Sequence, residues 1–297
     1  MDEKIRSLDA LGASRDRRAE RVAAAAAVAI AEATAQVSNA PAVRAAAAKG
    51  PMESALEEEK IGLTDTVVFQ HRVVQFEAAR RERERILPPG AGGPNGTAYK
   101  MLRTQVMRRL HDFGANTLAV LSADKGEGKT LTAINLAIAV AADHGHTALL
   151  VDFDLHNPSV HRRLGFEPEI GVEDCLLEQR PIYEAMVKVA GYERLTVLPA
   201  RRRMEQSSEW LAGQRVAELV EELRARYYNR VLIFDLPPVL LTDDALAFSR
   251  HVQAGLFVVS ESKTARDGVT RSLSLLNHLP IVGTVLNRSE DRPGAYY

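Results

Sequence analysis

AVLSADKGEGKTLTAINLA, residues 119–137, is the stretch of sequence that decides the fold. An apolar strand over 118–121 leads into a glycine-rich turn, and an apolar helix follows it. Glycines let backbone N–H groups close around phosphate oxygens, and the N-terminus of a helix adds positive potential. The order strand, loop, helix therefore predicts a phosphate-binding loop rather than a chance glycine-rich turn, although the pattern G-x-x-x-x-G-K-[ST] asks for glycine where Ala123 stands.

Within this loop, Lys129 is expected to reach the outer phosphates of a nucleotide, and the Thr130 hydroxyl is expected to bind Mg2+. A phosphate loop alone indicates only that a nucleotide binds. The predicted nucleotide contacts are Asp124, Lys125, Gly126, Glu127, Gly128, Lys129, Thr130 and Leu131.

Composition narrows the class of protein. The chain has 297 residues, of which 46% are hydrophobic and 26% are charged, as is ordinary for a globular protein. A net charge of −1 gives no global electrostatic reason to expect nucleic acid as a partner. The single cysteine, Cys175, excludes an intrachain disulfide and a multi-cysteine metal site, and it is expected to be a small core residue.

The organisation of the chain changes near residue 95. Residues 1–50 are rich in alanine and arginine with few large apolar side chains, so a stable independent core is not expected there. We expect helices over 17–37 and 66–86 and a Pro/Gly-rich linker over 88–96. The predicted division is an extension over 1–95, a domain over 96–290 and a mobile tail over 291–297.

Apolar strands and amphipathic helices alternate from residue 97 onward. Several strands are continuous apolar runs, which are typical of strands buried on both faces of a parallel sheet. The pattern predicts an α/β fold with a doubly wound, mostly parallel sheet and ligands at the carboxyl ends of its strands. The expected strands are 117–122, 147–152, 195–199, 230–235, 255–260 and 280–286, and the expected helices are 98–113, 129–143, 208–226, 243–251 and 265–278.

Three carboxylates are expected to complete the nucleotide site. Asp152 and Asp154 follow the apolar run 148–151, and Asp235 follows the apolar run 231–234. An acidic residue at the tip of a buried strand is costly unless it serves a ligand or an ion, and Mg2+ takes one or two carboxylates together with phosphate oxygens and water. Capping of a following helix is the alternative for any one of them, and it is weaker for three beside a phosphate loop.

These motifs together resemble the bacterial tyrosine kinases (BY-kinases) of capsule and exopolysaccharide assembly. That family belongs to the P-loop ATPases, which also include the septum-site and partition ATPases. The likeness rests on the segments 122–130, 149–156 and 231–238, and it spans about 97–297. The short tail and the N-terminal extension are most similar to the kinases encoded with exosortase-type systems.

The resemblance implies ATP-dependent phosphorylation of tyrosine. Thr130, Asp154 and Asp235 would hold Mg2+ directly or through water, and Lys129 would hold the β and γ phosphates. The expected catalytic residues are Lys129, Asp152 and Asp154, and the resemblance assigns to Asp152 the role of orienting the tyrosine hydroxyl or accepting its proton, although the sequence alone does not rank Asp152 against Asp154. The remaining implied residues are Asn287 and Arg288 beside the adenine, and Tyr296 and Tyr297 as phosphoacceptors.

Some positions depart from the family pattern. His156 stands where an arginine is usual, Lys125 replaces a proline, and Asp124 occupies the place of the signature lysine of the partition ATPases. The oligomerisation motif E-x-x-R-x-x-R has Thr97 in place of its glutamate. The alternatives are a partition- or septum-type ATPase that switches a partner without phosphorylating it, and a non-catalytic nucleotide-gated scaffold.

The expected location and partners follow from the same observations. The first 20 residues are heavily charged, and the longest apolar stretch, 22–31, is shorter than the ~20 residues that span a bilayer. We expect a cytoplasmic protein, with peripheral association at the inner face of the plasma membrane left open. The resemblance implies a membrane polysaccharide co-polymerase, on a separate chain, as activator, together with self-association and no nucleic acid.

Overall fold

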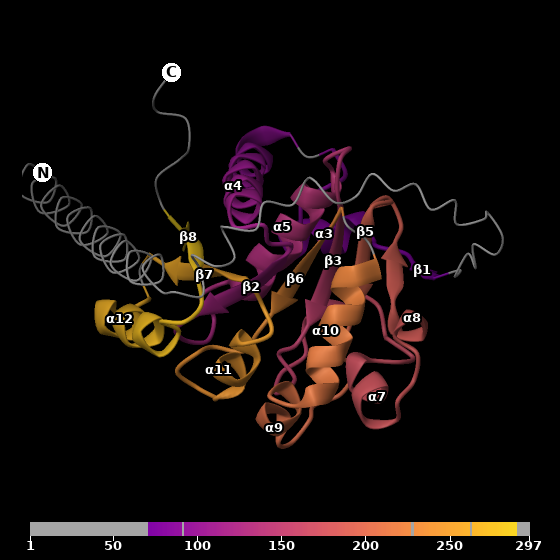
Figure 1. The fold of residues 1–297 in the computed structure, drawn as a ribbon. Coiled ribbons are helices and arrows are strands. Elements are labelled where there is room, and N and C mark those ends of the chain that lie inside the picture. The colour runs from indigo at the N-terminus through magenta and orange to yellow at the C-terminus, as the bar shows by residue number, and fades with distance from the viewer. Residues whose placement is uncertain (1–70, 91, 227–228, 262, 290–297) are drawn as a thin grey trace, which may run out of the picture.

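A single mixed sheet forms the centre of the computed structural model, which describes residues 71–90, 92–226, 229–261 and 263–289 (Figure 1). The strands lie in the order β1-β4-β5-β3-β6-β2-β7-β8, and every pairing is parallel except that of β4 with β5. The predicted doubly wound, mostly parallel sheet is therefore confirmed. The strands are β1 (Arg72–Val74), β2 (Thr117–Ser122), β3 (Thr147–Asp152), β4 (Val187–Val189), β5 (Leu195–Leu198), β6 (Arg230–Asp235), β7 (Ala254–Ser260) and β8 (Ile281–Asn287).

Helices cover both faces of the sheet because its central strands are apolar on both faces. Along β2, Ala119 and Leu121 join one buried cluster, and Leu118 and Val120 join the other, as alternation of side chains requires. Helices α10, α11 and α12 pack against the first cluster and α4 and α5 against the second. The helices are α3 (Ala78–Arg83), α4 (Gly93–Asp112), α5 (Lys129–Ala141), α6 (Val160–Leu164), α7 (Val172–Leu177), α8 (Ile182–Ala185), α9 (Ser207–Leu211), α10 (Gln214–Arg226), α11 (Asp244–Ser249) and α12 (Arg266–Leu275).

The strand order brings distant carboxylates together. Strand β6 lies between β2 and β3. The loop after β2 is therefore close to the carboxyl ends of both β6 and β3. Asp152 is directly opposite Asp235 in the ladder of β3 with β6, and Val120 is opposite Asp235 in the ladder of β2 with β6. The site at this edge is thus a consequence of topology.

A short strand of the sheet lies within the segment predicted as the N-terminal extension, 1–95. The helix predicted over 66–86 is wrong in part, because β1 forms within it and, of its described residues 71–86, only those of α3 are helical. Strand β1 joins the sheet beside β4, so the sheet begins earlier than residue 96. With three residues, two of them exposed, β1 has no periodicity that a sequence pattern could detect.

Other boundaries differ by local causes. Helix α4 starts inside the predicted linker because Pro94 stands in its first turn, where proline is well tolerated. The helix predicted over 208–226 is divided into α9 and α10 near Gly213. The predicted helix over 17–37 and the tail over 291–297 lie outside the described residues. No helix in the described part of the chain is long and apolar enough to cross a membrane.

An aromatic cluster lies beneath the carboxylate edge of the sheet. Phe153, Phe234 and Phe248 are fully buried. The ring of Phe248 is 4.9 Å from that of Phe153, in a T-shaped arrangement, and 4.9 Å from that of Phe234. Because Phe153 lies between Asp152 and Asp154, and Phe234 precedes Asp235, this cluster fixes the backbone that carries all three carboxylates.

We expect Phe248→Ala to lower the free energy of unfolding by about 3–5 kcal/mol, since it removes a buried ring and leaves a cavity. Urea denaturation followed by circular dichroism measures the change. Leu275→Ala is the matched control, because Leu275 is 48% exposed, and it should change stability by less than about 0.5 kcal/mol. Equal losses in the two variants would contradict the assigned role of the cluster.

Candidate nucleotide-binding active site

The phosphate loop joins β2 to α5, as predicted. Gly126 and Gly128 have φ values of 73° and 96°, a region that residues with a Cβ rarely adopt. A Cβ on Gly128 would also lie 1.8 Å from Nδ2 of Asn287, so both the dihedral angle and the available space require glycine here. Ala123 is buried and is absent from the residues with positive φ, so this position of the loop needs no glycine.

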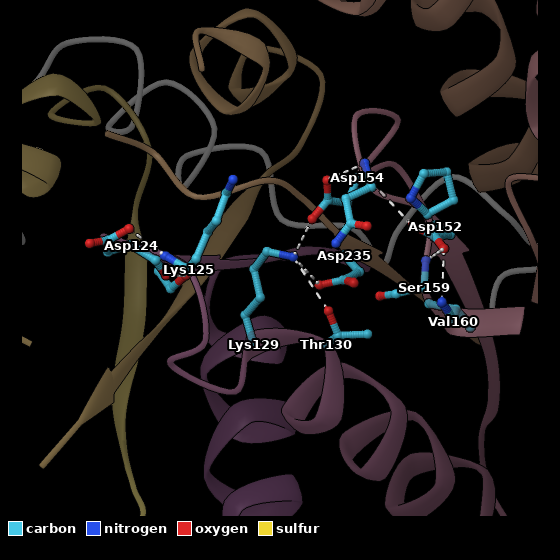
Figure 2. A network of polar contacts seen from close by, with 12 residues as sticks. Asp124, Lys125, Lys129, Thr130, Asp152, Asp154, Ser159, Val160 and Asp235 are labelled. Carbon is cyan, nitrogen blue, oxygen red and sulfur yellow. Dashed lines mark hydrogen bonds and ion pairs between the residues drawn. The ribbon is translucent and has the colours of Figure 1, made fainter. Parts of the chain in front are cut away.

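Lys129, the first residue of α5, has its ammonium group in the midst of the predicted metal ligands (Figure 2). Its Nζ donates to Asp154 Oδ2 at 2.9 Å, to Asp235 Oδ1 at 3.3 Å and to Thr130 Oγ1 at 3.4 Å. Burial by itself lowers the pKa of Lys129, but attraction by Asp235 and Asp154 outweighs it and raises that pKa. We call these four residues the Lys129 cluster.

Asp235 is completely buried, and its Oδ2 has no hydrogen-bond partner among the described residues. The pKa of Asp235 is raised, because burial raises it more than attraction by Lys129 lowers it, and repulsion from Asp154 raises it further. A buried carboxylate oxygen without a partner is costly and suits a cation or its water. The described residues contain no group of three or more His, Cys, Asp or Glu side chains that could hold a metal by itself. One hydroxyl and two carboxylates nonetheless fit Mg2+, which takes its other ligands from phosphate and water.

Asp152 has a different environment from the other two carboxylates. Its Oδ2 accepts the N–H groups of Ser159 at 2.9 Å and Val160 at 3.0 Å, and its Oδ1 accepts the N–H of Asp154 at 3.3 Å. Burial, followed by repulsion from Asp235, raises its pKa to about 8. Strand β3 ends at Asp152. The side chain of Asp152 holds the loop after β3 to the start of α6, while the side chain of Asp154 contacts Lys129.

The other predicted loop contacts lie around this centre. Asp124 and Lys125 are exposed, and Figure 2 shows them apart from the Lys129 cluster. Leu131 is half-buried in the first turn of α5. Glu127 is 1% exposed and turns to Thr264 instead of the Lys129 cluster.

The predicted adenine contacts are used within the protein. Asn287 Nδ2 donates to the carbonyl of Glu127 at 2.8 Å, and its Oδ1 accepts the N–H of Arg288 at 2.9 Å. Arg288 is exposed with a φ of 58°. Tyr296 and Tyr297 lie outside the described residues.

A second polar group, which sequence reasoning did not assemble, adjoins the site. His156 Nε2 lies 3.1 Å from Ser207 Oγ and 3.5 Å from Asp244 Oδ1, and Ser207 Oγ donates to Asp244 Oδ2 at 2.7 Å. Asp244 is fully buried, and burial raises its pKa. His156 therefore still links the loop after β3 to α9 and α11, although the resemblance expects arginine at its position.

Comparison of the chain with known proteins identifies its family. The model of the ParA family, described as an NUBPL iron-transfer P-loop NTPase, matches residues 115–291. The tyrosine-protein kinase YwqD of Bacillus subtilis is 30% identical over 195 residues, which are 65% of this chain and 81% of YwqD. The chain belongs to the bacterial tyrosine kinases of the ParA-type P-loop NTPases.

Longer and solved members of the family agree with this assignment. The tyrosine-protein kinase wzc of Salmonella typhi is 27% identical over 67% of this chain, which spans only 27% of wzc. The crystal structure of the chimerical protein CapA2B2 has a TM-score of 0.64 and 25% identity, covering 74% of this chain and 94% of that one. The kinase domain of Escherichia coli ETK, at 24% identity, a TM-score of 0.60 and coverage of 67% of this chain and 77% of that one, shares the fold of this bacterial tyrosine kinase.

The raised pKa of Asp152 predicts a pH dependence of stability. Between its ordinary pKa near 3.9 in the unfolded chain and about 8 in the folded one, the folded state holds one more proton. The contribution of Asp152 to stability is therefore greatest below its unfolded pKa and falls as pH rises towards 8, by at most about 1.4 kcal/mol per pH unit. Urea denaturation between pH 5 and pH 8 measures the slope.

Asp152→Asn should flatten this slope, because the titrating carboxyl is gone. Asp267→Asn, at an exposed position in α12, is the matched control and should keep the wild-type slope. A wild-type slope in Asp152→Asn would show that Asp152 is already ionised in the folded protein at the lower end of the range.

Proposed function

We propose that this protein is an ATP-dependent protein-tyrosine autokinase that regulates the polymerisation and export of an exopolysaccharide or capsule. The observation that carries the proposal is the Lys129 cluster, in which the loop lysine and two strand-tip carboxylates meet within hydrogen-bond distance. Membership of the bacterial tyrosine kinases supports tyrosine as the phosphate acceptor. A relative named as the succinoglycan biosynthesis transport protein ExoP of Rhizobium meliloti supports a role in exopolysaccharide assembly.

Phosphoryl transfer in such a site depends on positioning and charge neutralisation. In the proposal, the ammonium of Lys129 and the loop N–H groups hold the β and γ phosphates of ATP. Thr130, Asp154 and Asp235 hold Mg2+, directly or through water, and the unpartnered Oδ2 of Asp235 is available for this. Bound Mg2+ would neutralise phosphate charge in the transition state. Asn287 and Arg288 remain proposed contacts beside the adenine.

Asp152 is proposed to orient the acceptor hydroxyl or take its proton. A carboxylate whose pKa is raised to about 8 is, once ionised, a stronger base than an ordinary aspartate. Its hydrogen bonds also favour an orienting role, because they fix the backbone at Asp154 and Ser159. Asp154 pairs with Lys129, and its side chain is 9% exposed. It is therefore the more accessible of the two carboxylates, since Asp152 is fully buried.

Tyr296 and Tyr297 are the proposed phosphoacceptors, and they would be phosphorylated by a second copy of the chain. We further propose a membrane polysaccharide co-polymerase as the activator, at the inner face of the plasma membrane. Both proposals rest on membership of the family.

Incubation with γ-labelled ATP and Mg2+ tests the proposal. Wild-type protein should acquire label as phosphotyrosine, and Lys129→Met should lose at least about 100-fold of it, because the phosphates lose their main cation. Tyr296→Phe with Tyr297→Phe should lose most of the label. Phosphotyrosine is detected by mass spectrometry, and the incorporated label is counted. The protein is co-expressed with the activator.

The matched controls are Lys188→Met and Tyr183→Phe, which remove a lysine and a phenol hydroxyl away from the site and should label like wild type. Equal labelling of the double Phe variant would remove the tail from the mechanism. ATP hydrolysis without phosphotyrosine would instead support a partition-type ATPase.

A further inference from the structure

The phosphate loop is fastened to the ends of β7 and β8 by side chains far away in the sequence. Lys263 and Thr264 follow β7, and Asn287 ends β8. All three contact the loop at Lys125 or Glu127. We call Glu127, Lys263, Thr264 and Asn287 the loop brace.

Glu127 is the centre of the brace. Its Oε1 accepts the hydroxyl of Thr264 at 2.5 Å, and its Oε2 accepts the N–H of Asp124 at 3.1 Å. The Thr264 hydroxyl in turn accepts the N–H of Ser260, the last residue of β7, at 2.8 Å. Both oxygens of this buried carboxylate thus accept hydrogen bonds from the protein, and Glu127 joins the phosphate loop to the segment after β7.

The brace also determines where the loop N–H groups point. Lys263 donates to the carbonyl of Lys125, and Asn287 donates to the carbonyl of Glu127 at 2.8 Å. In a trans peptide the C=O and the following N–H point in opposite directions, and no cis peptide occurs in the described chain. Holding these two carbonyls therefore aims the N–H group of Gly126 away from Lys263 and the N–H group of Gly128 away from the side chain of Asn287.

We propose that the loop brace consists of positioning residues for the nucleotide: it orients the phosphate-binding N–H groups without touching the phosphates. The inference rests on the proposed function only for the binding of a nucleoside triphosphate. It assigns to Glu127 and Thr264 a role that the loop pattern itself does not contain, because their contact joins residues 137 positions apart.

The Thr264 hydroxyl gives the most direct test. Thr264→Val keeps the shape of the side chain and removes its hydroxyl, so Glu127 loses a donor and the Ser260 N–H loses an acceptor. The loop must then be ordered when the nucleotide binds, which weakens binding. We expect the dissociation constant of a fluorescent ATP analogue with Mg2+ to rise roughly tenfold.

Two further variants of the full chain complete the experiment. Thr264→Ser retains the hydroxyl and should bind within about twofold of wild type. Thr270→Val is the matched control, because Thr270 is exposed on α12 and its hydroxyl donates to the carbonyl of Arg266 within the same helix, and this variant should bind like wild type. Thermal unfolding of each free variant separates loss of stability from loss of affinity. Glu127→Gln combined with Thr264→Val should be non-additive in affinity.

A Thr264→Val protein that binds the analogue like wild type, whether or not it unfolds at a lower temperature, would overturn the inference. So would failure of Thr264→Ser to restore affinity. The proposed kinase activity fails separately, on phosphotyrosine: a wild-type chain that binds the analogue but makes no phosphotyrosine would refute the activity and leave the brace intact. A wild-type chain that does not bind the analogue would refute both.

Discussion

The buried charges around Lys129 are the constraint on which the rest of the structure depends. One ammonium group faces Asp154 and Asp235, with Asp152 close behind them, and all four side chains are nearly or completely buried. Such a group is stable only if the charges balance, and three ionised carboxylates exceed one lysine. Burial first, and then repulsion from a neighbouring carboxylate, raises the pKa values of Asp152 and Asp235. A divalent cation would supply the missing positive charge, so the fold favours the chemistry proposed for it.

Topology and packing keep this cluster in place. Because β6 lies between β2 and β3, the loop lysine and the carboxylates of two strands meet without any long connection. The alternation of side chains then places Phe153 and Phe234 next to these carboxylates in sequence but within the apolar core. The rings pack on Phe248, and the rigidity of that core is transmitted to the polar edge above it.

The sequence predicts what local patterns encode. Continuous apolar runs located β2, β3, β6 and β7, and the strand-tip carboxylates followed from them, since both signals are contiguous in the chain. Strands β1 and β4 were missed because three residues carry no period. The different environments of Asp152 and Asp154 do not follow from the residue pattern either, because β3 ends at Asp152 and the two side chains take different partners in the fold. The contacts of Glu127 with Thr264, and of His156 with Asp244, join segments whose proximity only the fold creates.

The departures of the loop from its usual pattern are explained by which atoms it uses. The loop uses the backbone at residue 125: its N–H donates to Asp124 Oδ1 at 2.6 Å, and its carbonyl accepts from Lys263. The exposed side chain takes no part in these contacts, so a lysine in place of proline leaves the brace unchanged and adds positive charge at the rim. Ala123 likewise fits because its backbone needs no glycine. Gly128 is the position that needs glycine, because its φ is positive and a Cβ there would meet Asn287. Asn287 in turn holds the carbonyl of Glu127, and with it the direction of the N–H group that follows.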